Sequence, residues 1–261
     1  MIMKLLGHIV PRMYIAVILL LLAISAISAY TLRQAPYALA AAVATCIITE
    51  VMITRFYHKH ALKVPYSAII TGLIIGAVAP ISGPVSLVVL ASLIALLSKH
   101  FLKIKRSNIF NPAAIGLLIS LALFGLGDEW WAAAAYPFHA IMIPISLVLV
   151  IGAYEAKRLA TAASYIAMMI TATAVISSIS SAVSISSIAM IALTTNYFFP
   201  LLMIADPKTS PVKPHVQSVF GAGVALVALA CSIMALPYAL LISIIVGNFA
   251  YATYRLKSNS R

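Results

Sequence analysis

Charged residues are scarce in this chain. Only 8% of the 261 residues are Asp, Glu, Lys or Arg, whereas hydrophobic residues make up 64%. A soluble domain carries about 25% charged residues, so this composition excludes a water-soluble globular protein and predicts one that lies in a lipid bilayer. No polar linker separates the apolar runs, and we therefore expect a single integral membrane domain over residues 1–261.

Side chains that hold the commonest cofactors are also few and scattered. Cys46 and Cys231 are the only cysteines and form no CxxC motif, so the chain alone offers neither an iron–sulfur nor a zinc site, and no metal ligand is predicted. The six histidines fall in or beside predicted loops, which excludes a haem held by two histidines at membrane depth. Phosphate-loop, serine-hydrolase and metalloprotease motifs are absent, and no catalytic residue is predicted.

The basic residues that are present predict the topology. The net charge of +12 comes from short, scattered clusters rather than from a continuous surface for nucleic acid. Every Lys and Arg except Arg33 falls on one side of ten predicted spans, so that side is cytoplasmic and holds both termini of this multi-pass plasma-membrane protein. Trp130–Trp131 fit an aromatic belt at the outer interface. The spans lie near 13–31, 36–54, 66–80, 84–98, 108–127, 137–154, 159–176, 185–205, 217–235 and 237–254.

Ten spans divide into two halves of five, and an odd number gives the second half the opposite orientation. This parity predicts an all-α fold built as a 5+5 inverted repeat. The run 66–80 ends at Pro80 and the chain restarts after Gly83–Pro84, while the run after Pro112 is also short. Either these segments are a tight hairpin and a proline-capped span, or they are half-helices whose amino ends point into a central site.

Two polar breaks interrupt the apolar runs, IFNPAAIG at 109–116 and IADPKTSP at 204–211. Asn–Pro and Asp–Pro pairs each combine a capping side chain with a proline suited to the first helical turn, and Ser210–Pro211 offers a second start. A helix amino terminus beside lysines can hold a phosphate, such as that of FMN. The alternative is that these residues only cap helices. The candidate cofactor-binding residues are Asn111, Asp206, Lys208, Thr209 and Ser210.

Glu50 is the only carboxylate inside a predicted span. It either pairs with Arg55 or Lys59 at the cytoplasmic end of the span, or it takes part in a proton or ion relay, because an intramembrane acid is costly without a purpose.

These motifs carry a family resemblance. The stretch 67–121, which includes FNPAA, and the stretch FFPLLMIADPKTSPVKP at 198–214 resemble the membrane family of the D subunit of Rnf electron-transport complexes. The B subunit of the sodium-translocating NADH:quinone reductase belongs to the same family. The resemblance implies a ten-helix inverted-repeat fold similar to that of urea transporters. It also implies a flavin-carrying role in electron transfer, together with other membrane or redox subunits.

One departure from the family bears on the cofactor. Family members with covalent flavin attach the FMN phosphate to a threonine in an S-G-A-T type motif after the FNPAA helix. The corresponding stretch here, GLGDEWWAAAAYPFHAIMIP at 125–144, contains neither serine nor threonine. The sequence therefore predicts no covalent FMN, and any FMN or riboflavin would be bound non-covalently.

Two functions follow as alternatives. In the first, the chain is a membrane subunit of an Rnf/Nqr-type ion-translocating electron-transport complex. In the second, it is a transporter or channel for a small solute, such as a flavin or another neutral molecule, on the same scaffold without redox chemistry. The family motifs favour the first function and the missing threonine favours the second. Enzymatic activity of the isolated chain is not expected.

Overall fold

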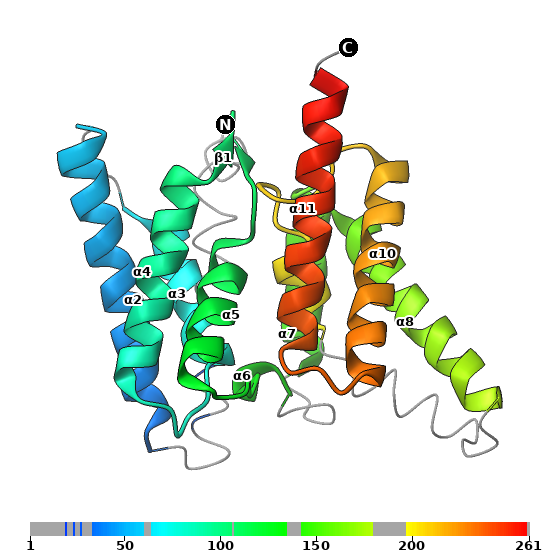
Figure 1. Cartoon of the computed structure of the whole chain (residues 1–261), viewed down its shortest axis with the longest axis horizontal. Helices are drawn as coiled ribbons and strands as arrows, with labels where there is room; N and C mark the ends of the chain where they lie inside the picture. Colours follow the sequence, from blue (N-terminus) through cyan, green and yellow to red (C-terminus); the bar gives the residue numbers. More distant parts are fainter. Residues whose placement is uncertain are drawn as a thin grey trace. The chain divides into compact units, whose positions relative to one another are not determined.

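The computed structural model describes Leu19, Ala23, Ile27 and residues 33–59, 64–105, 107–134, 142–179 and 197–259. These residues are almost entirely helical, and the two-residue strands β1 (Lys103–Ile104) and β2 (Ser107–Asn108) pair in a short hairpin (Figure 1). The chain divides into two compact units: unit 1 is Met1–Lys103 with Pro112–Ala135, and unit 2 is Ile104–Asn111 with Tyr136–Arg261. The single membrane domain stays a prediction.

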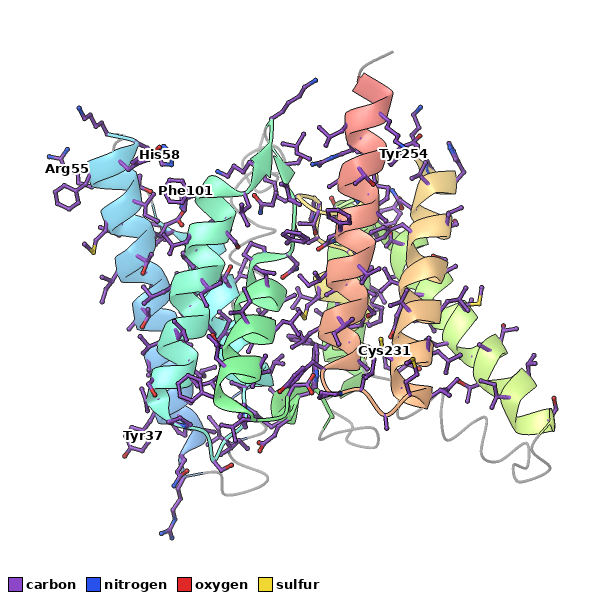
Figure 2. The ribbon with its side chains drawn as sticks, viewed as in Figure 1. Tyr37, Arg55, His58, Phe101, Cys231 and Tyr254 are labelled. Carbon is purple, nitrogen blue, oxygen red and sulfur yellow. The ribbon has the colours of Figure 1, made fainter. Side chains whose placement is uncertain are left out.

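Unit 1 is a set of apolar helices in which α4 (Val85–Phe101) contacts both α2 (Ala35–Met52) and α5 (Pro112–Phe124) (Figure 1). Helix α2 continues without a break into the π-helical turn η1, and Tyr37 and His58 mark the two ends of this long segment (Figure 2). Gly72 allows α3 and α2 to approach closely. A methyl group at this position would lie only 2.6 Å from Val43 Cα, which is too close for a side chain. The elements are α2 (Ala35–Met52), η1 (Ile53–Tyr57), α3 (Tyr66–Val78), α4 (Val85–Phe101), α5 (Pro112–Phe124) and α6 (Trp131–Ala134).

The short helix α3 ends where the sequence predicts a break, just before Pro80. The segment before α6 covers this end, since the amide of Glu129 donates to Val78 O at 3.0 Å and its carboxylate accepts from the amide of Ile81 at 2.8 Å. Trp131 donates its indole N–H to Gly76 O at 2.8 Å. Both tryptophans of the pair are buried, and the indole N–H of Trp130 donates to Asp128 Oδ2 at 2.6 Å. Their place in an outer interfacial belt stays a prediction.

Unit 2 is also a set of apolar helices. Helix α10 packs against α8 and α11, and η2 contacts α7 and α8 (Figure 1). At the α8–α10 crossing a methyl group on Gly221 would overlap the carbonyl oxygen of Thr161, so glycine is required there. The elements are α7 (Met142–Glu155), α8 (Leu159–Ile179), η2 (Phe199–Ile204), α10 (Pro214–Ile233) and α11 (Ala239–Asn259).

Four described helices are long and apolar enough to cross a membrane, namely Ala35–Tyr57, Leu159–Ile176, Pro214–Ile233 and Ala239–Lys257. The all-α membrane class is therefore confirmed, while ten spans and their inverted repeat stay predictions. The predicted span 13–31 lies outside the described residues except for Leu19, Ala23 and Ile27, as do residues 137–141 of the sixth span and 185–196 of the eighth.

The predicted helix starts have different outcomes. Helix α5 begins at Pro112, as the Asn–Pro pair predicts. The starts predicted at Asp206–Pro207 and Ser210–Pro211 are wrong, because α10 begins at Pro214. Each proline lacks an amide donor and disfavours helical backbone in the residue before it, so three prolines within eight residues keep this segment a loop until the last of them.

Candidate functional site

Four of the five candidate residues, Asp206, Lys208, Thr209 and Ser210, lie in one loop between η2 and α10, which we call the 205–213 loop. Asp206 organises it: one carboxylate oxygen accepts from the Lys208 amide at 3.0 Å and the other from the Thr209 hydroxyl at 3.2 Å. The Asp206 carbonyl accepts from the amides of Thr209 and Ser210 and from the Ser210 hydroxyl, the last at 2.6 Å. The aspartate therefore caps a turn of this loop rather than a helix.

Arg158, just before α8, holds the loop in place. Its side chain is only 5% exposed, and its Nε donates to Ser210 Oγ at 2.9 Å. The two Nη atoms donate to the carbonyls of Ala156, Lys157 and Pro207, at 3.3, 3.0 and 3.5 Å. All four acceptors are uncharged. Among the described residues, no carboxylate lies within ion-pair distance of this buried guanidinium.

Three buried amide side chains join further segments to the loop. Asn248 of α11, 1% exposed, accepts from the Asn111 amide at 2.8 Å and donates to Thr209 O at 3.4 Å. The side-chain amide of Asn111 donates to Met203 O at 3.3 Å. Gln217 of α10 donates to the carbonyls of Lys157 and Val212 at 2.8 and 2.9 Å. Because every partner is a main-chain group, these bonds fix the backbone path of the loop.

The electrostatics of the loop are dominated by cations. Burial raises the pKa of the Asp206 carboxyl, while the hydrogen bonds from Lys208 and Thr209 lower it. Burial likewise lowers the pKa of the Arg158 guanidinium. Lys208 and Lys213 are exposed on the loop, and Lys157 is exposed beside Arg158. The surface presented by the loop is thus positive and suits an anionic group such as a phosphate.

The structure brings together the five candidate residues but gives them different accessibility. Thr209 and Ser210 are 1% and 3% exposed and Asn111 is 4% exposed, whereas Asp206 is half-buried. Lys208 alone among the five is exposed. In this conformation the two hydroxyls bond inside the loop, and the lysine is the candidate that can reach a ligand.

Sequence reasoning missed Arg158, Gln217 and Asn248. Arg158 was counted only as a topology-setting charge of a short loop, and nothing in its neighbours marks it as buried. The two amides did carry a signal, since Asn248 lies inside the long apolar run 237–254 and Gln217 at the start of another. A polar side chain in such a run faces a bundle interior and a partner more often than lipid.

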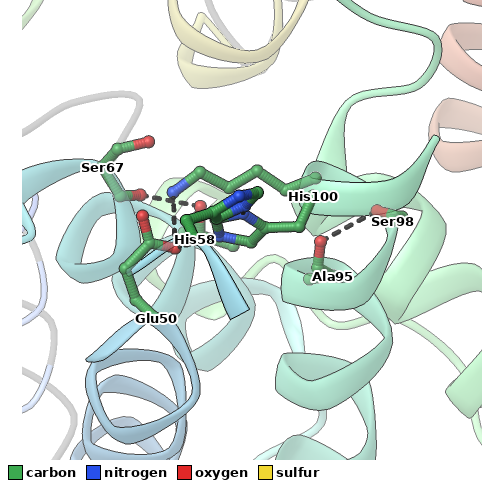
Figure 3. Close-up of polar contacts among 8 residues, drawn as sticks. Glu50, His58, Ser67, Ala95, Ser98 and His100 are labelled. Atoms are coloured by element: carbon green, nitrogen blue, oxygen red, sulfur yellow. Dashed lines mark hydrogen bonds and ion pairs between the residues drawn. The ribbon is translucent and has the colours of Figure 1, made fainter. Parts of the chain in front are cut away.

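A second polar cluster lies in unit 1, around Glu50 (Figure 3). The carboxylate accepts from Lys99 Nζ at 3.0 Å and lies 2.8 Å from Nε2 of His100, both near the end of α4. The expected partners Arg55 and Lys59 are wrong: both side chains are exposed, and the Glu50 partners are 49 and 50 residues away in sequence. The packing of α4 on α2 brings Lys99 and His100 to this carboxylate.

Unit 2 also carries an apolar groove of about 260 Å³ between α7, α8 and η2. Its walls are almost purely hydrocarbon, so it suits a lipid chain or the apolar edge of a ligand rather than a charged group. The lining residues are Val150, Leu159, Ala163, Ile166, Tyr197 and Leu201.

Comparison with known protein families gives a match. The model of the NQR2, RnfD, RnfE family matches residues 7–140, just over half of the chain. This region contains the FNPAA motif and the Glu50 cluster, whereas the 205–213 loop lies beyond it. No curated protein matches the chain.

Proposed function

The chain belongs to the NQR2, RnfD, RnfE family, and from this membership we propose that it is a membrane subunit of an Rnf/Nqr-type ion-translocating electron-transport complex. The family match over residues 7–140 is the observation that carries the proposal. The apolar helices support its place in the membrane. The proposed partners are the other membrane and redox subunits of such a complex, and the proposed location is the plasma membrane with both termini in the cytoplasm.

We propose further that any flavin is held without a covalent bond. Residues 125–144 offer no serine or threonine hydroxyl to which the FMN phosphate could be esterified. The 205–213 loop is the proposed phosphate contact, for which Lys208 supplies the exposed charge. Asp206, Thr209 and Ser210 shape the loop from within, and Asn111 anchors it through Met203. Arg158 adds a fixed positive charge beneath the loop.

The 5+5 inverted repeat is part of the same proposal. In unit 1, α4 packs on α2 and α5, and in unit 2, α10 packs on α8 and α11. In the ten-span numbering these are the fourth span on the second and fifth, and the ninth on the seventh and tenth. The same order of contacts in each half supports a repeat, because residue-level similarity between the halves is not needed for a shared packing pattern.

The loop assignment is tested by comparing two flavins on the purified full chain in detergent. Lys208→Gln is expected to weaken FMN binding about fivefold, the effect of about 1 kcal/mol from one exposed ion pair. Riboflavin lacks the phosphate, so its affinity should not change. The control Lys103→Gln, at an exposed lysine of unit 1, should leave both affinities unchanged.

Equal effects of Lys208→Gln on FMN and riboflavin, or no effect on either, would remove the loop from the phosphate contact. If the purified chain binds neither FMN nor riboflavin, the solute transporter or channel would be the favoured function. The absence of a threonine from residues 125–144 also favours that alternative.

A further inference from the structure

Arg255, near the end of α11, has two guanidinium nitrogens that lack a hydrogen-bond acceptor. Nε and Nη2 are both shielded from water, and no residue that the structure describes accepts from either of them. These two atoms form one edge of the planar guanidinium, and their parallel N–H groups fit the oxygens of a phosphate or a carboxylate. Burying a charged donor without an acceptor is unfavourable. This edge therefore needs an acceptor from outside the described residues.

An aromatic ring positions the guanidinium. Arg255 Cζ lies 5.2 Å from the centre of the Tyr251 ring, which is one turn earlier on α11, and this is a cation–π distance. Tyr251 in turn stacks on Tyr254 with 6.4 Å between the ring centres, and it meets Phe220 of α10 edge-on at 6.1 Å. The ring holds the positive charge in place but offers neither nitrogen an oxygen acceptor.

The face of α11 that carries Arg255 is the face that contacts the 205–213 loop. Asn248 lies seven residues before Arg255, which puts the two side chains on the same side of the helix. Asn248 donates to Thr209 O at 3.4 Å. Arg255 is about 10 Å further along the axis, toward the end of the helix where Tyr254 is exposed (Figure 2). The site therefore lies beyond the loop contact and close to the surface.

Helix α10 adds no carboxylate at this level. The two helices run antiparallel, since Phe220 meets Tyr251 and Val224 faces Gly247. One turn further along α11 corresponds to one turn back along α10, so Arg255 lies opposite the first turn of α10. That turn has no acidic residue, and neither helix contains an aspartate or a glutamate anywhere.

The surrounding charge is positive. Tyr251 also lies close enough to Arg158 to favour the charged form of that guanidinium, and Arg158 donates only to uncharged oxygens. The Asp206 carboxylate accepts from Lys208 and Thr209 instead. Among the described residues, neither guanidinium has a carboxylate within ion-pair distance. Two arginines thus flank one tyrosine without an acidic partner, and a bound anion would balance them.

We propose that the Nε–Nη2 edge of Arg255 binds a phosphate group, with one phosphate oxygen accepting from each nitrogen. Arg255 lies near the end of Ala239–Lys257, a helix suited to crossing the membrane. Its edge is therefore at the depth of the lipid headgroups, where phosphate is the abundant oxyanion. A phospholipid headgroup and a free phosphate compound present the same oxygens to this edge. The site needs no flavin, so it is tested separately from the proposed redox function.

The test is the stability of the purified full chain in detergent, compared in chloride and in inorganic phosphate at equal ionic strength. A ligand that binds only the folded chain raises its unfolding midpoint, which the buried thiol of Cys231 on α10 reports in a Cys46→Ala background. We expect phosphate to raise the midpoint. Arg255→Gln should weaken phosphate binding about tenfold or more, as expected when a charged, bidentate donor is lost. Arg255→Lys should also weaken it, because lysine keeps the charge but not the two parallel donors.

A second arm separates the two sources of phosphate. Phosphatidylglycerol is added to the micelles in place of inorganic phosphate, and stabilisation by this lipid alone that Arg255→Gln abolishes would assign the site to a headgroup. The control Lys103→Gln removes one exposed charge from unit 1 and should leave both responses unchanged. Equal stabilisation of the wild type and Arg255→Gln by both additives, or stabilisation by neither, would overturn the proposal. If Arg255→Gln does not fold, Arg255→Lys decides.

Discussion

The close approach of α8 and α10 gives the sharpest prediction for the fold of unit 2. Gly221 and Gly223 are two residues apart on α10 and face different surroundings. A methyl group at Gly221 would overlap the carbonyl oxygen of Thr161 and Ser164 Oγ, whereas at Gly223 it would meet nothing within 4 Å. The serine hydroxyl can turn away, but the carbonyl belongs to the backbone of α8. Gly221→Ala therefore forces the two helices apart.

The magnitudes follow from two opposing effects. Replacing a helical glycine by alanine stabilises the helix by about 1 kcal/mol at either site. Overpacking at a rigid contact costs about 1–3 kcal/mol. Gly223→Ala should therefore be neutral or stabilising by up to about 1 kcal/mol, and Gly221→Ala should be less stable than Gly223→Ala by about 1–3 kcal/mol. The comparison between the two variants removes the helix-propensity effect.

Cys231, buried near the end of α10, supplies the assay. In a Cys46→Ala background it is the only thiol, so its reaction with a fluorescent maleimide during heating or denaturant titration in detergent reports unfolding of this helix. Equal stability of the two glycine variants, including an equal loss of stability in both, would refute the close α8–α10 contact.

Three further predictions concern other contacts. Arg158→Gln removes the charged donor to Ser210 and Pro207 and should destabilise unit 2 by about 1.5–3 kcal/mol, measured by the same thiol assay; an unchanged midpoint would contradict the role of Arg158 in the 205–213 loop. Trp131→Phe loses the bond to Gly76 O and should cost about 1 kcal/mol in denaturant unfolding, and no loss would mean that this end of α3 is satisfied otherwise. Single cysteines at Lys103 and Gly127, placed in a background without Cys46 and Cys231, should label from opposite sides of the membrane, and labelling from one side would contradict the predicted topology.

Local signals in the sequence predicted local features well. The Asn–Pro pair placed the start of α5 at Pro112, and Pro80 placed the end of α3. Both depend on backbone rules that act within a few residues. The Asp–Pro and Ser–Pro pairs have the same local pattern but do not start a helix. The Asp206 carboxylate accepts a hydrogen bond from the amide of Lys208 in its own loop, and α10 begins only at Pro214. Capping residues alone do not distinguish a helix start from a turn.

Contacts between distant segments were not predictable from one sequence. The partner of Glu50 was sought among nearby basic residues, yet packing of α4 on α2 brings Lys99 and His100 to it. Arg158 was likewise counted as a loop charge, although it is buried under the 205–213 loop. These partners depend on which helix faces pack together. Hydropathy and charge predict the spans and their orientation but not which helix faces are in contact.

The proposal that this chain is a redox subunit without covalent flavin can be tested with one visible spectrum, recorded before and after denaturation. The chain is isolated gently from its own membranes together with whatever subunits remain attached, and its visible absorbance is recorded before and after denaturation and removal of small molecules. We expect flavin absorbance in the native complex and none on the denatured chain. Flavin that stays on the denatured chain would contradict the interpretation of residues 125–144. A colourless native preparation that binds neither FMN nor riboflavin would contradict the redox function itself.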